Sequence, residues 1–265
     1  MSQMDTMLEH SIQEIAERCD GMVSVAVDLP SQAIHINGDR PCSAASLIKI
    51  PILLEGFRQS EKGMISLSEK VYVPKDERVG GAGVLTSLSE NVSLTIEDLL
   101  TLMIIVSDNT ASNLLIDRLG SKPIQDLCHS LNLKQTKLMR KLMDFKAMEQ
   151  GLNNFTSAHD IITCLKVMDN GEQFSQTSRE KMLNILQQQQ FDNKLPSRMD
   201  REKVFVANKT GELPGVEHDC AILKFKNKTA YIAVLIDELD ENEYGKDTIA
   251  RIGKLIFNSL INEEK

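Results

Sequence analysis

Two side chains that could carry out acyl transfer, Ser46 and Lys49, lie three residues apart in a largely apolar segment. Because three residues is close to one helical turn, the hydroxyl and the amine are expected on one face of a helix that begins near Ser46. Apolar neighbours exclude water from the lysine and disfavour its charged form, so the pKa of Lys49 should fall toward neutrality. A neutral amine can accept the serine proton, and the pattern therefore predicts a nucleophilic Ser46.

The same spacing has a structural explanation, in which an N-cap serine precedes a surface lysine. The chain contains a second example, Ser178 and Lys181, with polar and charged flanks that are typical of an exposed helix start. The apolar flanks of Ser46 and the motifs that follow it distinguish the two cases.

Three further short motifs follow in order: Ser107-Asp108-Asn109, Glu149-Gln150-Gly151-Leu152-Asn153 and Lys209-Thr210-Gly211. Alone, the first could be a polar turn between helices, and the last a strand end with a turn glycine. Their order and contexts together indicate one site, because a serine opens a buried helix, the second motif lies between helices and the last ends a strand.

With these motifs the sequence resembles the penicillin-recognising serine hydrolases, and most closely the class A β-lactamases. The signatures of that family are S-x-x-K, S-D-N, E-x-x-L-N and K-T-G. The likeness spans nearly the whole chain and includes the extended segments 107–115 and 209–215.

The resemblance implies a catalytic role for four residues. Ser46 attacks a carbonyl carbon and becomes acylated, while Lys49 keeps its hydroxyl ready to lose a proton. Ser107 relays a proton to the leaving nitrogen, assisted by the positive charge of Lys209.

The resemblance also implies how a substrate is held. A substrate carboxylate binds to the charge of Lys209 and to a hydrogen bond from Thr210 within the motif that Gly211 completes. Asn109 bonds the acylamide side chain of the substrate. The oxyanion hole uses the backbone N–H groups of Ser46 and Glu212, and loss of one such donor typically costs ~3 kcal/mol of transition-state stabilisation.

Glu149 and Asn153 match the pair that orients the deacylating water in class A β-lactamases, but their spacing departs from the family. About a dozen residues usually separate that asparagine from the threonine-rich start of the next helix, whereas here residues 154–157 follow at once. Counting from Ser107 at the usual family distance leads instead to residues 142–144. Glu149 as general base, and Asp144 as the alternative carboxylate, both remain open.

A second departure concerns the substrate carboxylate. Class A enzymes often carry an arginine just beyond K-T-G, where this chain has His218 between Glu217 and Asp219. Either the grip on a carboxylate is weaker or the substrate differs. The structural alternative is a partly exposed histidine at a strand end.

Composition narrows the remaining possibilities. A chain of 265 residues with a net charge of -8 and no basic run argues against a nucleic-acid surface. No tract of 18 apolar residues is present, so we expect no membrane span.

Five scattered cysteines without C-x-x-C spacing predict reduced thiols, with Cys128 and Cys164 in the core. The histidine spacing predicts no metal site. The start of the chain lacks a leader pattern, so we expect a cytoplasmic protein, provided that Met1 is the true start.

Hydrophobic periodicity predicts an α/β protein of the α+β type. An antiparallel sheet built from both chain ends packs against an all-helical lobe, as in β-lactamases and transpeptidases. The single catalytic domain, residues 1–265, comprises a sheet lobe of about 1–45 and 200–265 and a helical lobe of about 46–199.

Thr95 and Asp98 predict a capping box. The predicted strands are 22–28, 33–36, 204–209, 221–225 and 230–236, and the predicted helices are 7–18, 46–60, 99–106, 109–119, 124–131, 158–168, 178–189 and 246–261.

The sequence therefore favours a class A β-lactamase-type serine hydrolase that opens the β-lactam amide through acyl-Ser46. The expected partner is a small β-lactam or peptide-like amide, no metal or organic cofactor is implied, and we expect a monomer. A D-alanyl peptidase, a cytoplasmic amidase or esterase, and a penicillin-binding sensor of slow turnover are alternatives with the same acylation machinery.

Overall fold

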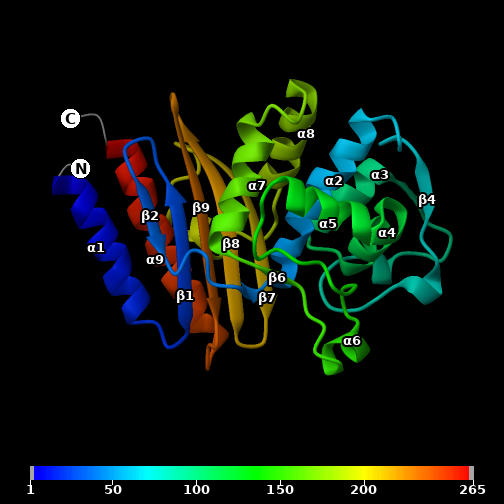
Figure 1. Cartoon of the computed structure of the whole chain (residues 1–265), viewed down its shortest axis with the longest axis horizontal. Helices are drawn as coiled ribbons and strands as arrows, with labels where there is room; N and C mark the ends of the chain where they lie inside the picture. The colour runs from blue at the N-terminus through cyan, green and yellow to red at the C-terminus, as the bar shows by residue number, and fades with distance from the viewer. Residues whose placement is uncertain (1–2, 263–265) are drawn as a thin grey trace.

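The computed structural model describes residues 3–262, and its centre is an antiparallel sheet in the strand order β2-β1-β9-β8-β7 (Figure 1). β1 pairs with β9, so the predicted sheet from both chain ends is confirmed. β7 is an edge strand, and one row of its backbone N–H and C=O groups is therefore left free by the sheet. The strands are β1 (Met22–Asp28), β2 (Ala33–Ile36), β7 (Phe205–Leu213), β8 (Val216–Phe225) and β9 (Lys228–Asp237).

Helices cover both faces of the sheet (Figure 1). On one face α9 (Asn242–Asn262) packs on β8 and α1 (Gln3–Glu17) packs on α9, and on the other face α7 (Ala158–Asn170) packs on β1 and β9. Because successive strand residues point to opposite faces, Val25 belongs to the core under α1 and α9, whereas Ala26 belongs to the core shared with the helical lobe.

The second lobe of the molecule is helical, and the capping box predicted at the start of one of its helices is present. Thr95 accepts a hydrogen bond from the Asp98 N–H, and Asp98 accepts one from the Thr95 N–H, which confirms the capping box. Its helices are α2 (Lys49–Glu61), α3 (Ile96–Ile105), α4 (Asn109–Leu119), α5 (Ser121–Ser130) and α8 (Gln176–Gln187).

The region around Ser46 differs from its prediction. Residues 45–48 form a 3₁₀ turn, η1 (Ala45–Ile48), and the α-helix begins only at Lys49. Pro51 is the third residue of α2, where the backbone N–H has no intrahelical partner to lose.

Several short elements carried no periodic signal and were not predicted. They are α6 (Phe145–Glu149), the paired strands β3 (Cys42–Ser43) and β6 (Phe155–Thr156), the paired strands β4 (Lys70–Tyr72) and β5 (Ser93–Thr95), and the 3₁₀ turns η2 (Lys75–Glu77), η3 (Leu85–Ser87) and η4 (Leu195–Arg198).

The cysteines serve packing. All five are free thiols, and Cys128 and Cys164 are buried in the core as expected. Burial raises the pKa of the Cys128 thiol to about 12, which keeps it protonated and unreactive. None of the helices within residues 3–262 combines the length and the apolar character of a membrane-spanning segment.

Candidate active site

Ser46 and Lys49 meet in the structure, although through a geometry that differs from the predicted helix face. Ser46 lies in η1, and side chains three residues apart are eclipsed in a 3₁₀ turn. The preceding residue, Ala45, has a left-handed φ of 43°, a strained conformation of the kind concentrated at functional sites. The Lys49 Nζ lies 3.1 Å from the Ser46 Oγ, which is within reach for proton transfer.

Lys49 is completely buried, and its amine lies among oxygen atoms. The Nζ donates to the Ser107 carbonyl at 2.7 Å and to the Asn109 Oδ1 at 2.9 Å. These two acceptors use both N–H groups of a neutral amine and leave its lone pair for a hydroxyl proton. Burial, and then the charge of Lys209, lowers the pKa of Lys49 well below its usual value. A neutral Lys49 is therefore positioned to accept a proton from Ser46.

The loop between α3 and α4 holds Ser107 in a left-handed conformation, with φ of 55°. Asp108 fixes this loop: its Oδ1 caps α4 by accepting the Ala111 N–H, and its Oδ2 accepts the N–H groups of Val84 and Leu85. The carboxylate of Asp108 thus joins the loop to the segment that precedes η3 and fixes the neighbouring Ser107 beside Lys49.

Lys209 reaches the same centre from the edge strand β7. Its buried Nζ donates to the Ser107 Oγ at 3.1 Å and to the Thr210 carbonyl at 2.7 Å. Burial lowers the pKa of Lys209 to about 7. Because the Lys49 Nζ lies 2.9 Å from the same Ser107 Oγ, this hydroxyl links two buried amines. A hydroxyl in that position can pass a proton from one side of the site to the other.

Gly211 allows β7 to approach the nucleophile closely. A Cβ at this position would lie 3.3 Å from both the Ser46 N and the Ala45 Cβ. The absence of a side chain therefore brings the strand edge against η1. The expected oxyanion hole, formed by the N–H groups of Ser46 and Glu212, requires this closeness.

Two cavities meet at Ser46, and Ala82 and Glu212 also line both. The smaller, of about 330 Å³, is lined further by Ser107 and Thr210. The larger, of about 1030 Å³, extends past Asn109 toward α6 and the β7–β8 turn. A substrate carbonyl at Ser46 would therefore have room on both sides.

The sequence model of the beta-lactamase enzyme family matches residues 7–260 of the chain. The chain belongs to the beta-lactamase enzyme family. Comparison with curated protein sequences gives no match.

Solved structures of the family superimpose closely. A beta-lactamase from Sphaerobacter thermophilus is 29% identical, with a TM-score of 0.90, and the match covers 96% of this chain and 97% of that one. PBP-A is 26% identical with a TM-score of 0.88, over 97% and 96% of the two chains. A leucine-to-glutamate mutant of PBP-A, solved as an acyl-enzyme complex with penicillin G, is 25% identical with a TM-score of 0.87, over 97% of each chain. The predicted family and fold are thereby confirmed.

Glu149, which the family motif predicts to activate water, is the last residue of α6. It is exposed at the end of α6 and is absent from the described residues that line either cavity. Asp144, the alternative carboxylate, caps α6 by accepting the Ala147 N–H. Asn153 does line the larger cavity, where its side chain bonds to Arg140 and Ser43. Of the two residues of this sequence motif, Asn153 therefore lies in the lining of the larger cavity and Glu149 does not.

Leu142 instead lines the larger cavity, which reaches Ser46. Its backbone N–H and C=O bond to the side-chain amide of Asn113 at 2.8 and 3.0 Å. Held in this way, Leu142 is nearly buried and lines the larger cavity with Ser46 and Asn109. A signal for this position was present in the sequence, since counting from Ser107 at the usual family distance leads to residues 142–144.

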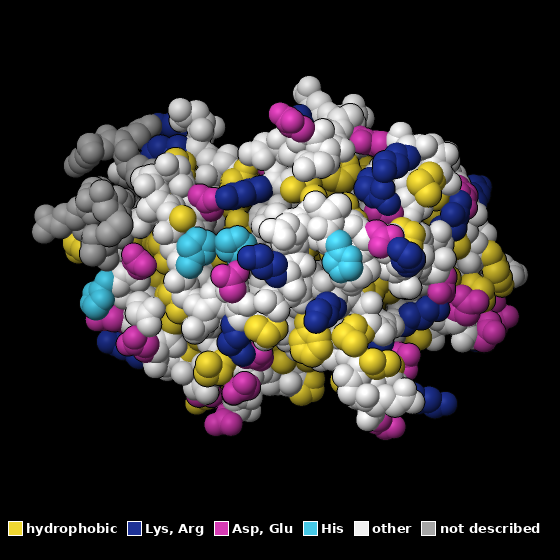
Figure 2. Space-filling view, in the orientation of Figure 1, with side chains coloured by type: hydrophobic (Ala, Val, Ile, Leu, Met, Phe, Trp, Pro, Cys, Tyr) yellow, Lys and Arg dark blue, Asp and Glu magenta, His cyan; other side chains and the backbone are white. Residues whose placement is uncertain are grey.

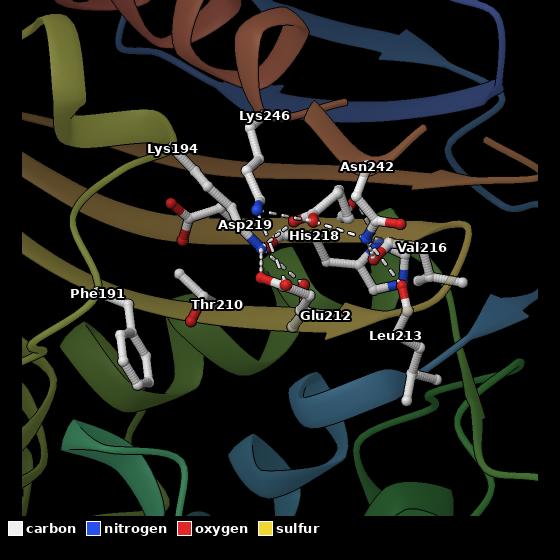
Figure 3. Close-up of polar contacts among 12 residues, drawn as sticks. Phe191, Lys194, Thr210, Glu212, Leu213, Val216, His218, Asp219, Asn242 and Lys246 are labelled. Carbon is white, nitrogen blue, oxygen red and sulfur yellow. Dashed lines mark hydrogen bonds and ion pairs between the residues drawn. The ribbon is translucent and has the colours of Figure 1, made fainter. Parts of the chain in front are cut away.

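Sequence reasoning missed Lys194. This buried lysine lines the smaller cavity, forms an ion pair with Glu217 and donates to the Gly211 carbonyl at 2.9 Å. Figure 3 shows Lys194 and Lys246 converging behind Glu212, to which each Nζ lies at 3.8 Å. These contacts of Lys194 and Lys246 stabilise β7, the strand that carries the K-T-G motif.

The expectation of a partly exposed His218 is wrong. His218 is completely buried in β8, and its Nε2 lies 2.7 Å from the Ser43 carbonyl while its Nδ1 accepts the Ile236 N–H. Burial lowers the pKa of His218 to about 4, so the ring is neutral at physiological pH. The basic side chain at the smaller cavity is Lys194 rather than His218.

The glycines before η3 allow a test of how closely this segment packs against Asp108. Gly83 has φ of 120°, and a Cβ there would lie 2.3 Å from the Asp108 Oδ2. We expect Gly83→Ala to lower the free energy of unfolding by about 1–3 kcal/mol, measured by urea denaturation. Gly80→Ala is the control, because nothing lies within 4 Å of its Cβ position. Equal stability of the two variants would contradict this packing.

Proposed function

We propose that this chain is a serine acyl-transfer enzyme that forms an acyl-Ser46 intermediate readily and hydrolyses it slowly. Its activity would then resemble that of a penicillin-binding D-alanyl peptidase rather than that of a fast β-lactamase. The observation that carries the proposal is Leu142, which lines the cavity at Ser46 where a carboxylate would be needed to activate water.

Acylation follows from the contacts around Ser46. The Ser46 Oγ attacks the carbonyl carbon while its proton passes to the neutral Lys49 Nζ, 3.1 Å away. The N–H groups of Ser46 and Glu212 would stabilise the oxyanion. As the carbon–nitrogen bond breaks, Ser107 gives its proton to the leaving nitrogen and takes one from Lys49, whose Nζ lies 2.9 Å from the Ser107 Oγ.

The smaller cavity suits a carboxylate on the leaving group. Thr210 and Lys194 line it, and the Lys209 Nζ donates to the Oγ of Ser107, which also lines it. Charge-assisted hydrogen bonds to a carboxylate are among the stronger polar contacts. β-Lactams and peptide-like amides that end in a carboxylate both present this group beside the bond that breaks.

Deacylation requires a base next to the ester. Among the described residues that line the two cavities, the carboxylate is that of Glu212. That side chain is 56% exposed and faces Lys194 and Lys246. Glu149 is exposed outside the lining, so water at the ester would lack an aligned general base.

The second candidate, a fast β-lactamase, is favoured by the 29% identity to the Sphaerobacter thermophilus beta-lactamase. It would require a carboxylate from elsewhere in the chain to approach the acyl-ester. The two functions differ in one measurable quantity, the lifetime of the acyl-enzyme.

Leu142→Glu tests the proposal directly. A carboxylate held by Asn113 at this position should speed hydrolysis of a penicillin-derived acyl-enzyme by about 10-fold or more, since a positioned general base typically contributes 10²–10⁴-fold. The rate is measured by intact-mass spectrometry after excess penicillin is removed. Leu142→Gln, of matched shape but without a base, should leave hydrolysis slow.

Glu149→Gln completes the comparison. We expect its deacylation rate to match that of the parent protein, because Glu149 lies outside the cavity lining. A large decrease in this variant, together with fast parent turnover, would assign the water-activating role to Glu149 and favour the β-lactamase.

The pH dependence of acylation tests the role of Lys209. Its pKa of about 7 means that its charge is lost as the pH rises through neutrality. For a substrate with a carboxylate, the second-order acylation rate should fall by up to about tenfold per pH unit above that value. A matched substrate whose carboxylate is replaced by a methyl ester should show a smaller decrease, because only the proton relay through Ser107 would then depend on the charge of Lys209. Identical profiles for the two substrates would contradict the role.

A further inference from the structure

We propose that this protein docks on anionic lipid membranes through the outer surface of α6 and of the segments on either side of it. This surface combines exposed apolar side chains with unpaired lysines. We call it the basic-apolar patch, and its members are Lys137, Met139, Phe145, Lys146, Met148 and Leu152. Docking determines where the protein acts rather than its chemistry, so it goes beyond the proposed function and is independent of it.

Exposed apolar side chains are concentrated in this part of the chain. Twelve large hydrophobic side chains are exposed among the described residues, and four of them fall within residues 139–152. Phe145 is 59% exposed, Met139 44%, Met148 40% and Leu152 36%. Because apolar surface is stabilised when it leaves water, a concentration of this kind indicates contact with another surface.

Three of these side chains belong to α6 and the turn that ends it. Phe145 and Met148 are three residues apart on the helix, so they lie on one side of it. The Leu152 N–H donates to the Ala147 carbonyl at 3.0 Å, which holds Leu152 against the same helix. Their exposed surfaces are therefore neighbours.

The chain before α6 runs beside the chain that follows it. The Met139 N–H donates to the Asn154 Oδ1 at 2.8 Å. The backbone of Lys137 pairs with that of Phe155 in an antiparallel bridge. Met139 and Lys137, both exposed, therefore border the surface around α6. Figure 2 shows hydrophobic side chains gathered by α6 with Lys and Arg side chains beside them.

The patch carries positive charge in a protein with a net charge of -8. Residues 137–152 include four basic side chains and two acidic ones. Lys141 pairs with Asp117. Lys137 and Lys146 are exposed, and neither ammonium group has an ion-pair partner among the residues that the structure describes. The patch is therefore complementary to an anionic surface, which the rest of the protein would repel.

The shape of this region favours a lipid surface over a protein partner. α6 is a helix of five residues that projects at the edge of the molecule (Figure 1). A short projecting helix offers little fixed surface to a folded partner, whereas a layer of lipid headgroups adapts to it. Apolar side chains can enter that layer while lysine side chains keep their ammonium groups at the phosphates. Because Phe145 and Met148 also line the larger cavity, docking would place its mouth beside the membrane.

Vesicle flotation tests the proposal. The protein is mixed with vesicles of phosphatidylcholine, alone or with phosphatidylglycerol, and the floating fraction gives the partition coefficient. We expect partition into the anionic vesicles to be at least about tenfold stronger than into the neutral ones, and to be lost at high salt. Equal partition into the two kinds of vesicle, or binding to neither, would overturn the inference.

Matched lysine variants locate the contact. Lys137→Gln combined with Lys146→Gln should lower partition into anionic vesicles by about 20-fold, since each basic group at such a surface contributes about fivefold. Lys62→Gln combined with Lys70→Gln makes the same change in net charge at two exposed lysines outside the patch. This control pair should lower partition by less than about threefold. Equal losses in the two pairs would show an effect of net charge alone and contradict the patch.

The apolar part of the contact has its own pair of variants. Phe145→Ser should lower partition into anionic vesicles several-fold, because less apolar surface then enters the lipid. Met64→Ser should leave partition unchanged, because Met64 is 57% exposed but lies outside the patch. Equal partition of these two variants would contradict an apolar contact at α6.

Two further measurements separate the alternatives. Ser46→Ala cannot be acylated but should float as the parent protein does, so failure of the proposed function would leave docking intact. Analytical ultracentrifugation shows whether the patch instead binds a second copy of the chain. Self-association that the Lys137 and Lys146 variant abolishes, without vesicle binding by the parent protein, would overturn the inference.

Discussion

The site depends on burying two lysine amines on either side of one serine hydroxyl. The Ser107 Oγ lies 2.9 Å from the Lys49 Nζ and 3.1 Å from the Lys209 Nζ, and both lysines are fully buried. Two positive charges at this separation would repel each other strongly without water. Burial, and then the charge of Lys209, lowers the pKa of Lys49 well below its usual value, which favours the neutral amine that the proposed role as base for Ser46 requires. The strain at Ala45 and Ser107 is the conformational cost of this arrangement.

Around these lysines, several loops are held by polar side chains that hydrogen-bond to backbone groups; each such set of bonds is called a clamp here. The amide of Asn113 fixes Leu142, the Asn154 side chain bonds to the backbone of residues 139 and 140, and Asp108 fixes the segment before η3. Because each clamp holds backbone rather than a side chain, the residue that it presents can change without altering the loop. Under the proposed function, the lifetime of the acyl-enzyme depends on which side chain stands at position 142.

The sequence predicted the parts of the fold that have strong local signals. The capping box at Thr95, the hairpin from Met22 to Ile36 and the alternating C-terminal strands all have a period or a cap to detect. The 3₁₀ turn at Ser46 could not be distinguished from an α-helix, since both place residues three apart on one side. The five-residue α6 was too short to show a period.

The limits of prediction at the site have a common origin. Ser46, Lys49, Ser107 and Lys209 were found because their motifs are compact, and the structure brings them together. Lys194 reaches its cavity through a tertiary contact with Glu217, which no local pattern reports. Residues 142–144 were reached only by counting from Ser107 at the family distance, and the contact of Leu142 with Asn113 is likewise tertiary. Glu149 shows the opposite case, a motif match that the fold leaves exposed.

The lifetime of a penicillin-derived adduct on the unmodified protein tests the central claim most directly. The protein is mixed with a penicillin, freed of excess drug, and followed by intact-mass spectrometry with peptide mapping of the modified residue. The account predicts rapid, stoichiometric acylation of Ser46 and an adduct that persists long after the drug is removed. Free protein accompanied by accumulating hydrolysed penicillin, or an adduct on any residue other than Ser46, would contradict it.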